Sequence, residues 1–448
     1  MHSTRSVSSF FDKEYLEYAK YVVENRAIPS CIDGLKPTQR KVVYIANKIW
    51  KTGNEKPMKL FQLAGRVAAE AFYHHGNTSL ESSMVGMAQK FKNSLPLLEG
   101  IGQFGSLRSP AAGAPRYISA KLHPNFRLLY QDFELLDNKI EEGEKIEPEY
   151  FLPIVPTVIL NGTSGIAVGF ATNILNRNPM DVVNACISEV NGKRMKTLTP
   201  WVQEFGGTFT RDTENPKTWK ISGSYEVVNS NTIKITSIPP NYTYERYEEI
   251  LNLLMEKGII TSYDDNSSET IEYVLKFKRA ILKDLISKNR LERVLRLNTQ
   301  ETENLTTIDE NGELKIFNKA EEIVQHFVQV RLGWYQTRKD YLIDKTEKQL
   351  ALVTNKARFI KDIIEGKLKV NNVPKEKIVN YLKTNAYDTV HGSYDYLLSM
   401  AIHSLTKERY EKLLQEKEGC IIALKTLKAT DPKEMYLTDL KKLKAAIK

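Results

Sequence analysis

The sequence is poor in cysteine and contains no long hydrophobic run. Its three cysteines, Cys31, Cys186 and Cys420, are widely spaced and odd in number, which excludes a disulfide framework and a CxxC metal site. No apolar stretch approaches the roughly 20 residues of a membrane-spanning helix, and the N-terminus lacks the apolar core of a signal peptide. We therefore expect a cytoplasmic chain that does not associate with membranes.

Motifs for nucleotide and metal binding are missing as well. The sequence contains no GxxxxGK[ST] loop, the motif that cradles nucleotide phosphates. It contains no DxD pair of carboxylates, since Asp264 and Asp265 are adjacent, and the neighbours His74 and His75 do not make a metal site by themselves. We assign no metal ligand to this chain.

Charge is distributed unevenly along the chain, which carries a net charge of +9. Between Arg26 and Arg66 nine basic residues stand against two acidic ones, whereas eight acidic residues and two lysines lie between Asp132 and Glu149. The first segment is suited to a polyanion such as nucleic acid, and the second would repel one. Two ordinary solvated surfaces are the alternative interpretation.

The first 150 or so residues have mainly helical spacing of apolar residues. Helices are predicted over 59–72 and 78–91, with Thr78 and Glu81 at the spacing of a capping box. A short glycine-containing turn joins them within a basic region, so a helix-turn-helix that binds DNA is one interpretation. Ordinary helical proteins contain such pairs too.

The remainder of the chain changes character twice. An acidic, turn-bearing segment over 132–153 is a plausible domain boundary, and beyond it alternating patterns predict strands over 218–228 and 232–238. Helical patterns over 244–257 and 279–297 make this middle part mixed α and β.

Two long helices are predicted in the last third, over 319–364 and 407–427. They flank a short segment that contains Gly366, Pro374 and Gly392. This arrangement predicts an antiparallel coiled-coil arm with a small tip, and a helical bundle is the alternative.

The neighbours Arg116 and Tyr117 combine a guanidinium with a phenol. A free phenol is a weak nucleophile at neutral pH, and a neighbouring cation favours the reactive phenolate. The same cation stabilises charge that develops on phosphorus in the transition state. A tyrosine that attacks a phosphodiester conserves the energy of the broken linkage in a phosphotyrosine, so the strand can be resealed.

Five stretches, in this order and at this spacing, resemble the breakage-reunion subunit of type IIA DNA topoisomerases. They are NRAIPSCIDGLKPTQRKVVY (25–44), YHHGNTSLESSMVGMAQ (73–89), GQFGS (102–106), APRYISAKL (114–122) and LPIVPTVILNGTSGIAVGFATNI (152–174). The likeness recurs over 305–343 and so covers nearly the whole chain. It implies a cleavage-religation enzyme whose transient double-strand break lets a second duplex pass, with relaxation or decatenation as the output.

The resemblance implies a role for five residues in strand cleavage. Tyr117 is the nucleophile that becomes linked to the 5′ phosphate, and Arg116 contacts the scissile phosphate. His75 is a proton acceptor or phosphate ligand, and Arg26 and Lys41 reach into the active site.

Four further residues are implied to contact DNA. Ile166 is the wedge that enters a base step and bends the duplex, a known use of apolar side chains. Lys36 and Arg40 line the DNA, and Thr78 belongs to the start of the recognition helix.

The resemblance also implies a division of the chain and a set of partners. We expect a multidomain α+β fold with a winged-helix DNA gate over 1–150, an α/β tower over 151–310, and a long antiparallel coiled coil with a C-terminal dimer gate over 311–448. The protein would act on double-stranded DNA as a homodimer with an ATPase/Toprim subunit. That partner would bind ATP and hold most of the Mg²⁺.

Departures from the bacterial pattern narrow the resemblance. Tyr73 replaces the first histidine of the bacterial HPHG turn, and Ile32 and Gln39 stand where arginine and histidine are usual. No C-terminal β-propeller-like domain is expected, which argues against negative supercoiling and resembles the short phage-type subunits.

A non-catalytic DNA-bending protein on the same scaffold is the alternative function. The early position of Tyr117 does not suit a type IB topoisomerase or a tyrosine recombinase.

Overall fold

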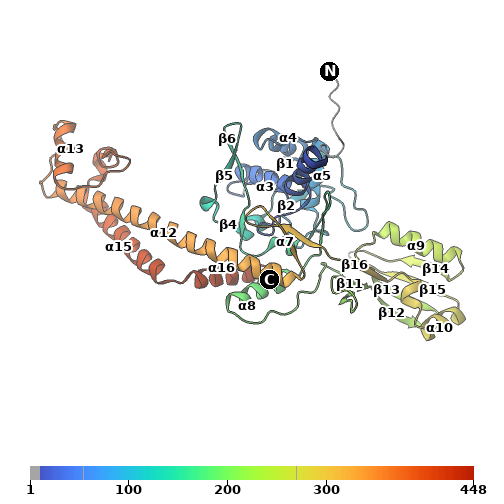
Figure 1. Ribbon diagram of the computed structural model, residues 1–448. Coiled ribbons are helices and arrows are strands. Elements are labelled where there is room, and N and C mark those ends of the chain that lie inside the picture. The colour runs from blue at the N-terminus through green and yellow to red at the C-terminus, as the bar shows by residue number, and fades with distance from the viewer. Residues whose placement is uncertain (1–10, 54, 269, 448) are drawn as a thin grey trace, which may run out of the picture. The chain divides into compact units, whose positions relative to one another are not determined.

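The computed structural model describes residues 11–53, 55–268 and 270–447 (Figure 1). The chain forms two compact units, Met1–Arg331 with Leu437–Lys448, and Leu332–Tyr436. Helices and antiparallel strands are interspersed through the first unit, whereas the second is helical. The expected combination of α and β structure is therefore confirmed. Within the described residues, no helix is both long enough and apolar enough to span a bilayer.

The first unit begins with helices around a small three-stranded sheet of order β1-β3-β2. Helices α3, α4 and α5 contact one another and bury an apolar face that includes Val42, Leu63 and Met84. The elements are η1 (Phe11–Tyr15), α2 (Leu16–Val22), η2 (Val23–Ala27), α3 (Pro37–Ile49), β1 (Met58–Lys59), α4 (Leu60–Glu70), α5 (Asn77–Ala88), β2 (Leu98–Ile101), β3 (Ser119–Leu122) and α6 (Pro124–Leu129).

The two helices predicted at 59–72 and 78–91 correspond to α4 and α5, but the predicted capping box is wrong. Helix α5 begins one residue earlier, with Gly76 as the N-cap residue. Thr78 therefore lies inside the first turn, where its carbonyl oxygen accepts a hydrogen bond from the Ser82 hydroxyl at 2.8 Å. Its exposed side chain does not cap the helix.

The acidic segment folds into short antiparallel pairs inside the first unit. Strand β5 (Asn138–Glu141) pairs with β6 (Glu144–Pro148), and β4 (Tyr130–Gln131) pairs with β7 (Leu152–Pro153). A second hairpin follows, in which β8 (Thr163–Ile166) pairs with β9 (Ala171–Ile174). Further elements here are η3 (Phe133–Leu135), α7 (Thr157–Leu160) and α8 (Pro179–Val190).

The middle of the chain contains a three-stranded sheet, a four-stranded sheet and a hairpin, of orders β10-β11-β16, β12-β13-β15-β14 and β17-β18. Apolar residues of the four-stranded sheet and its helices share one core, which includes Ile233, Tyr247, Leu275 and Leu282. The elements are β10 (Thr208–Arg211), β11 (Thr218–Ser222), β12 (Ser224–Asn229), β13 (Thr232–Ser237), α9 (Tyr244–Glu256), β14 (Ile260–Asp265), β15 (Tyr273–Phe277), α10 (Arg279–Ser287), α11 (Leu291–Val294), β16 (Asn298–Thr302), β17 (Leu305–Ile308) and β18 (Leu314–Phe317).

Two predicted elements of this region are each divided in the structure. The strand predicted at 218–228 becomes β11 and β12, separated at Gly223, where an added Cβ would lie 2.4 Å from the carbonyl oxygen of Ser237. The helix predicted at 279–297 becomes α10 and α11, because Asn289 adopts a left-handed conformation with φ of 55°.

The second unit contains an antiparallel pair of long helices. Helix α12 (Ala320–Ile364) begins in the first unit and continues into the second, and α15 (Lys407–Ala429) runs back along it (Figure 1). Lys428, late in α15, forms an ion pair with Glu347, whereas Leu413, early in α15, packs in a cluster with Val353 and Ile360. This order of contacts makes the pair antiparallel. The second unit also contains α13 (Lys375–Thr384), α14 (Asp395–Leu398) and η4 (Ile402–Ser404). Helix α16 (Pro432–Ala446) begins in the second unit and ends in the first.

Candidate active site

Tyr117 lies on the surface, in the loop that leads into strand β3. Its side chain is 73% exposed, unlike a tyrosine that serves the core. The backbone turns sharply here, since the Tyr117 amide donates to the carbonyl oxygen of Ala114 at 2.9 Å. The Arg116 guanidinium lies 5.8 Å from the centre of the phenol ring. Phenol and cation are therefore presented together to solvent, where a large substrate has access to both.

The start of helix α4 supports this tyrosine loop. The amides of Leu60 and Phe61 donate to the carbonyl oxygens of Ile118 and Pro115, at 3.1 and 3.4 Å. The ammonium of Lys59 donates to the carbonyl oxygen of Tyr117 at 2.8 Å. Sequence analysis overlooked Lys59 as a site residue. Its place directly before α4 in the basic segment was visible, but its contact across 58 residues was not.

His75 lies just before helix α5 and is exposed. Its Nε2 is 2.8 Å from the hydroxyl of Tyr21, and its ring meets Tyr73 edge to face at 5.3 Å between ring centres. The two tyrosines hold the imidazole in one orientation. Tyr21 is a second residue that sequence analysis overlooked, because 54 positions separate it from His75.

Lys41 is engaged by the acidic hairpin β5–β6. Its ammonium forms an ion pair with Glu147 at 3.0 Å, lies 3.7 Å from Glu141, and donates to the carbonyl oxygen of Ala71 at 2.5 Å. The Glu141 carboxylate also lies 3.2 Å from Nε2 of His74. The acidic segment is therefore a structural partner of the basic segment next to the histidine turn.

The structure contradicts the expectation that Arg40 lines the DNA. Arg40 is only 4% exposed, and its guanidinium makes two hydrogen bonds to the carboxylate of Asp33, at 2.6 and 3.0 Å. A third bond reaches the carbonyl oxygen of Leu35 at 3.1 Å. A buried cation that is satisfied by a buried carboxylate is unavailable to a phosphate, so Arg40 stabilises the fold of this loop.

Three other predicted residues lie together. Arg26, Lys36 and Ile166 line one open cavity of about 480 Å³, formed by η2, the start of α3 and the β8–β9 hairpin. Ile166 is 88% exposed, so its side chain is accessible to another molecule. The Lys36 ammonium donates to the carbonyl oxygen of Ser164 at 2.7 Å. Thr78 is exposed on the first turn of α5.

Not all predicted site residues meet within one chain. Among the described residues, no hydrogen bond or ring contact joins Tyr117 to His75 or to Arg26. The chain thus presents Arg116 and Tyr117 as one group, His75 with Tyr21 as a second, and Arg26 with Lys36 and Ile166 as a third.

One cluster of three potential metal ligands occurs in the described part of the chain, formed by Cys31, Glu310 and His326. Its thiol does not suit Mg²⁺, which prefers oxygen ligands. Both imidazole nitrogens of His326 already have partners, Glu310 at 2.7 Å and Lys315 at 3.0 Å. The residues of this cluster therefore do not fit a catalytic magnesium.

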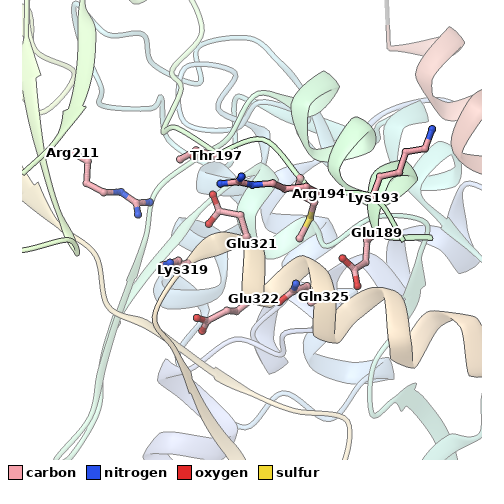
Figure 2. Close-up of a pocket in the computed structure, with 10 residues that line it drawn as sticks. Glu189, Lys193, Arg194, Thr197, Arg211, Lys319, Glu321, Glu322 and Gln325 are labelled. Carbon is pink, nitrogen blue, oxygen red and sulfur yellow. The ribbon is translucent and has the colours of Figure 1, made fainter. Parts of the chain in front are cut away.

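A separate cavity of about 360 Å³ lies between the end of α8, the loop that follows it and the start of α12 (Figure 2). Its lining combines cations such as Arg194 and Arg211 with the carboxylates of Glu189, Glu321 and Glu322. Because its lining carries both charges, the cavity favours neither anions nor cations. None of the predicted site residues lines it.

Comparison with known proteins defines the class. The family model for the A subunit of DNA gyrase/topoisomerase IV matches residues 26–444. The chain belongs to this family, and the resemblance to type IIA topoisomerases is confirmed.

Particular relatives agree with this assignment. The DNA topoisomerase medium subunit of Enterobacteria phage T4 is 34% identical over 446 residues, which cover 99% of each chain. The mitochondrial DNA topoisomerase 2 of Dictyostelium discoideum is 33% identical, across 99% of this chain and 35% of its own length. The chain thus spans about a third of the cellular topoisomerase 2 relatives. A crystal structure of the Plasmodium falciparum topoisomerase II DNA-binding, cleavage and re-ligation domain matches with a TM-score of 0.87 and 33% identity, over 98% of this chain and 64% of that one.

Proposed function

We propose that the protein is the DNA cleavage-religation subunit of a type IIA topoisomerase and that Tyr117 is its nucleophile. The observation that carries this proposal is the exposed Arg116–Tyr117 pair on a loop held by Lys59. Membership of the family of DNA gyrase and topoisomerase IV A subunits supports it.

The chemistry is a transesterification at phosphorus. The phenol oxygen of Tyr117 attacks, the bond between phosphorus and the 3′ oxygen breaks, and a 5′-phosphotyrosyl ester forms. Arg116 stabilises the extra negative charge of the transition state. His75 receives the phenol proton, or it binds the phosphate and water receives that proton. The 3′ oxygen takes a proton from water and leaves as a hydroxyl. The reverse reaction reseals the strand without an external energy source.

Ile166 bends the DNA in this proposal. An exposed apolar side chain that enters a base step unstacks it and kinks the duplex. Arg26 lies beside Ile166 in the same cavity, where its charge suits the backbone of a bent duplex.

We propose the expected division into a winged-helix gate over 1–150, a tower over 151–310, and a coiled coil with a dimer gate over 311–448. Two copies present two Tyr117 side chains to opposite strands, which produces a double-strand break. A second duplex passes through it, with relaxation or decatenation as the result.

A partner subunit completes the enzyme in this proposal. It carries the ATPase and Toprim domains, hydrolyses ATP, and holds the Mg²⁺ that cleavage requires. The lack of a GxxxxGK[ST] loop and a DxD pair in this sequence supports the assignment of both cofactors to the partner. We place the assembly in the cytoplasm, which for a phage protein is that of the host.

The test is covalent trapping of DNA. The chain is mixed with its ATPase/Toprim partner, Mg²⁺ and end-labelled plasmid, and the reaction is quenched with detergent. Wild type should trap DNA through its 5′ ends, whereas Tyr117→Phe should bind DNA and trap none. Tyr225→Phe, which removes a hydroxyl from strand β12, is the matched control and should trap DNA like wild type. Bending of DNA by wild type without any covalent product would favour the architectural alternative.

A further inference from the structure

The β8–β9 hairpin presents Ile166 at its end, next to a tight turn. Ile166 pairs with Ala171, and the amide of Ala167 donates to the carbonyl oxygen of Phe170 at 2.8 Å. A wedge must resist the stacking of the base step that it separates. The hairpin therefore needs support from outside its own two strands.

Lys36 supplies such support from the residue before helix α3. Its ammonium donates to the carbonyl oxygen of Ser164, two residues before Ile166 on the same strand. The lysine backbone is itself fixed, because its amide donates to the side chain of Gln39 at 3.0 Å. Lys36 is partly buried, and burial lowers the pKa of its ammonium. The hydrogen bond to Ser164 directs one of the three ammonium donors at the hairpin.

Close packing on Gly165 shows how tightly the strand is held. A Cβ at Gly165 would lie 2.2 Å from the carbonyl oxygen of Ala27 and 3.0 Å from the ammonium of Lys36. Strand β8 therefore lies directly against the end of η2. Beyond Ile166, Ala167 and Val168 pack on an apolar cluster from the same segment, formed by Val22, Val23, Ala27 and Ile28.

We propose that Lys36 is a positioning residue for Ile166, which fixes the hairpin so that the isoleucine can bend DNA, and that it is not a phosphate ligand. The inference rests on the proposed function, since a wedge has a task only where DNA is bent. It replaces the expectation that Lys36 lines the DNA by charge.

The two roles predict different salt dependences. Each phosphate contact releases counterions and contributes about 0.9 to the slope of log binding constant against log salt concentration. Loss of a phosphate ligand lowers that slope by about one per lysine and weakens binding uniformly across sequences. Loss of a positioning lysine leaves the slope unchanged and reduces the bend of the bound duplex.

The experiment measures both quantities on the full-length chain. A duplex of about 30 base pairs carries a fluorescent donor and acceptor at its ends, so that energy transfer reports bending at saturation. Ile166→Ala should reduce the change in energy transfer on binding. Lys36→Met should produce at least half of that reduction, and its salt slope should equal that of wild type. The double variant should bend no less than Ile166→Ala alone, because both changes act through one wedge. Lys48→Met, which removes an exposed lysine from helix α3, should bend DNA like wild type.

Gly165→Ala provides a test that leaves every charge in place. Its methyl group must displace the strand from Ala27, so we expect the same loss of bending with an unchanged salt slope. This variant decides the matter if Lys36→Met fails to fold. Two results would overturn the proposal. One is that Gly165→Ala bends DNA as much as wild type does, and the other is that Lys36→Met lowers the salt slope by about one per lysine. Failure of wild type to bend DNA would instead count against the proposed function itself.

Discussion

The ammonium of Lys59 and the carbonyl oxygen of Tyr117 form a hydrogen bond of 2.8 Å. Lys59 is the last residue of strand β1 and pairs with Ser119, the first residue of strand β3. Tyr117 lies two residues before Ser119. The start of α4 and this lysine together fix the backbone of the tyrosine loop. Correct placement of a nucleophile to within about an ångström strongly affects reaction rate.

Replacement of Lys59 should therefore slow cleavage without preventing DNA binding. We expect Lys59→Met to form the covalent complex about tenfold more slowly, because a hydrogen bond from a charged group contributes about 1.5–3 kcal/mol and this one is exposed. Lys59→Arg, which keeps a charged donor, should recover most of the rate. The measurement is rapid-quench trapping at saturating DNA. An unchanged rate in Lys59→Met would refute a positioning role.

Tyr21 should act on cleavage only through His75. Its hydroxyl lies 2.8 Å from Nε2 of the imidazole, so Tyr21→Phe should slow covalent trapping less than His75→Ala does. The double variant should match His75→Ala, since nothing remains for the hydroxyl to orient. Tyr225→Phe, which removes a hydroxyl from strand β12, is again the control. Additive losses in the double variant would show that Tyr21 contributes independently.

Local patterns in the sequence predicted helices α4 and α5 well, because periodic apolar spacing directly reflects which face of a helix is buried. The ends of elements were less predictable. The break at Asn289 depends on a left-handed backbone conformation, which asparagine tolerates but which helical spacing does not reveal.

The candidate site residues show the same difference between what local patterns predict and what depends on the fold. The motifs predicted Tyr117, His75 and Ile166 as site residues, and all three are exposed, but the motifs did not predict the contacts that hold them. Lys41 and Glu147 are separated by 106 positions, so their ion pair exists only through the fold. Arg40 lies in a strongly basic segment, and the sum of charges there could not reveal that Asp33 is buried with it as an ion-pair partner.

Asp33 should be essential for stability because it satisfies several buried donors. Besides the Arg40 guanidinium, its carboxylate accepts hydrogen bonds from the amides of Leu35 and Phe151, at 3.0 and 3.1 Å. Asp33→Ala leaves a buried cation without its partner, which typically costs about 3–5 kcal/mol. Denaturant unfolding should show this loss, and Asp137→Ala, at an exposed position, is the comparison. A loss below about 1 kcal/mol would mean that Arg40 finds another partner or solvent.

Cys31 should make the fold sensitive to alkaline pH. Burial, with a smaller effect from Glu310 and Asp309, raises the pKa of its thiol from 9.0 to about 12. The folded state thus favours the neutral thiol, so this stabilisation is complete below pH 9 and is lost as pH rises toward 12. Over that range the free energy of unfolding should fall by up to about 1.4 kcal/mol per pH unit through this one group.

The pH dependence of the free energy of unfolding distinguishes titration of the thiol from its packing. Cys31→Ala removes the titrating group, and any cavity that it leaves shifts stability equally at every pH. Urea unfolding at pH 8, 9, 10 and 10.5 should therefore show a shallower decline for Cys31→Ala than for wild type, while tyrosine titration, common to both, cancels in the difference. Cys420→Ala, at a partly exposed position, should follow wild type. Parallel curves for Cys31→Ala and wild type would mean that the folded and unfolded states bind this proton equally.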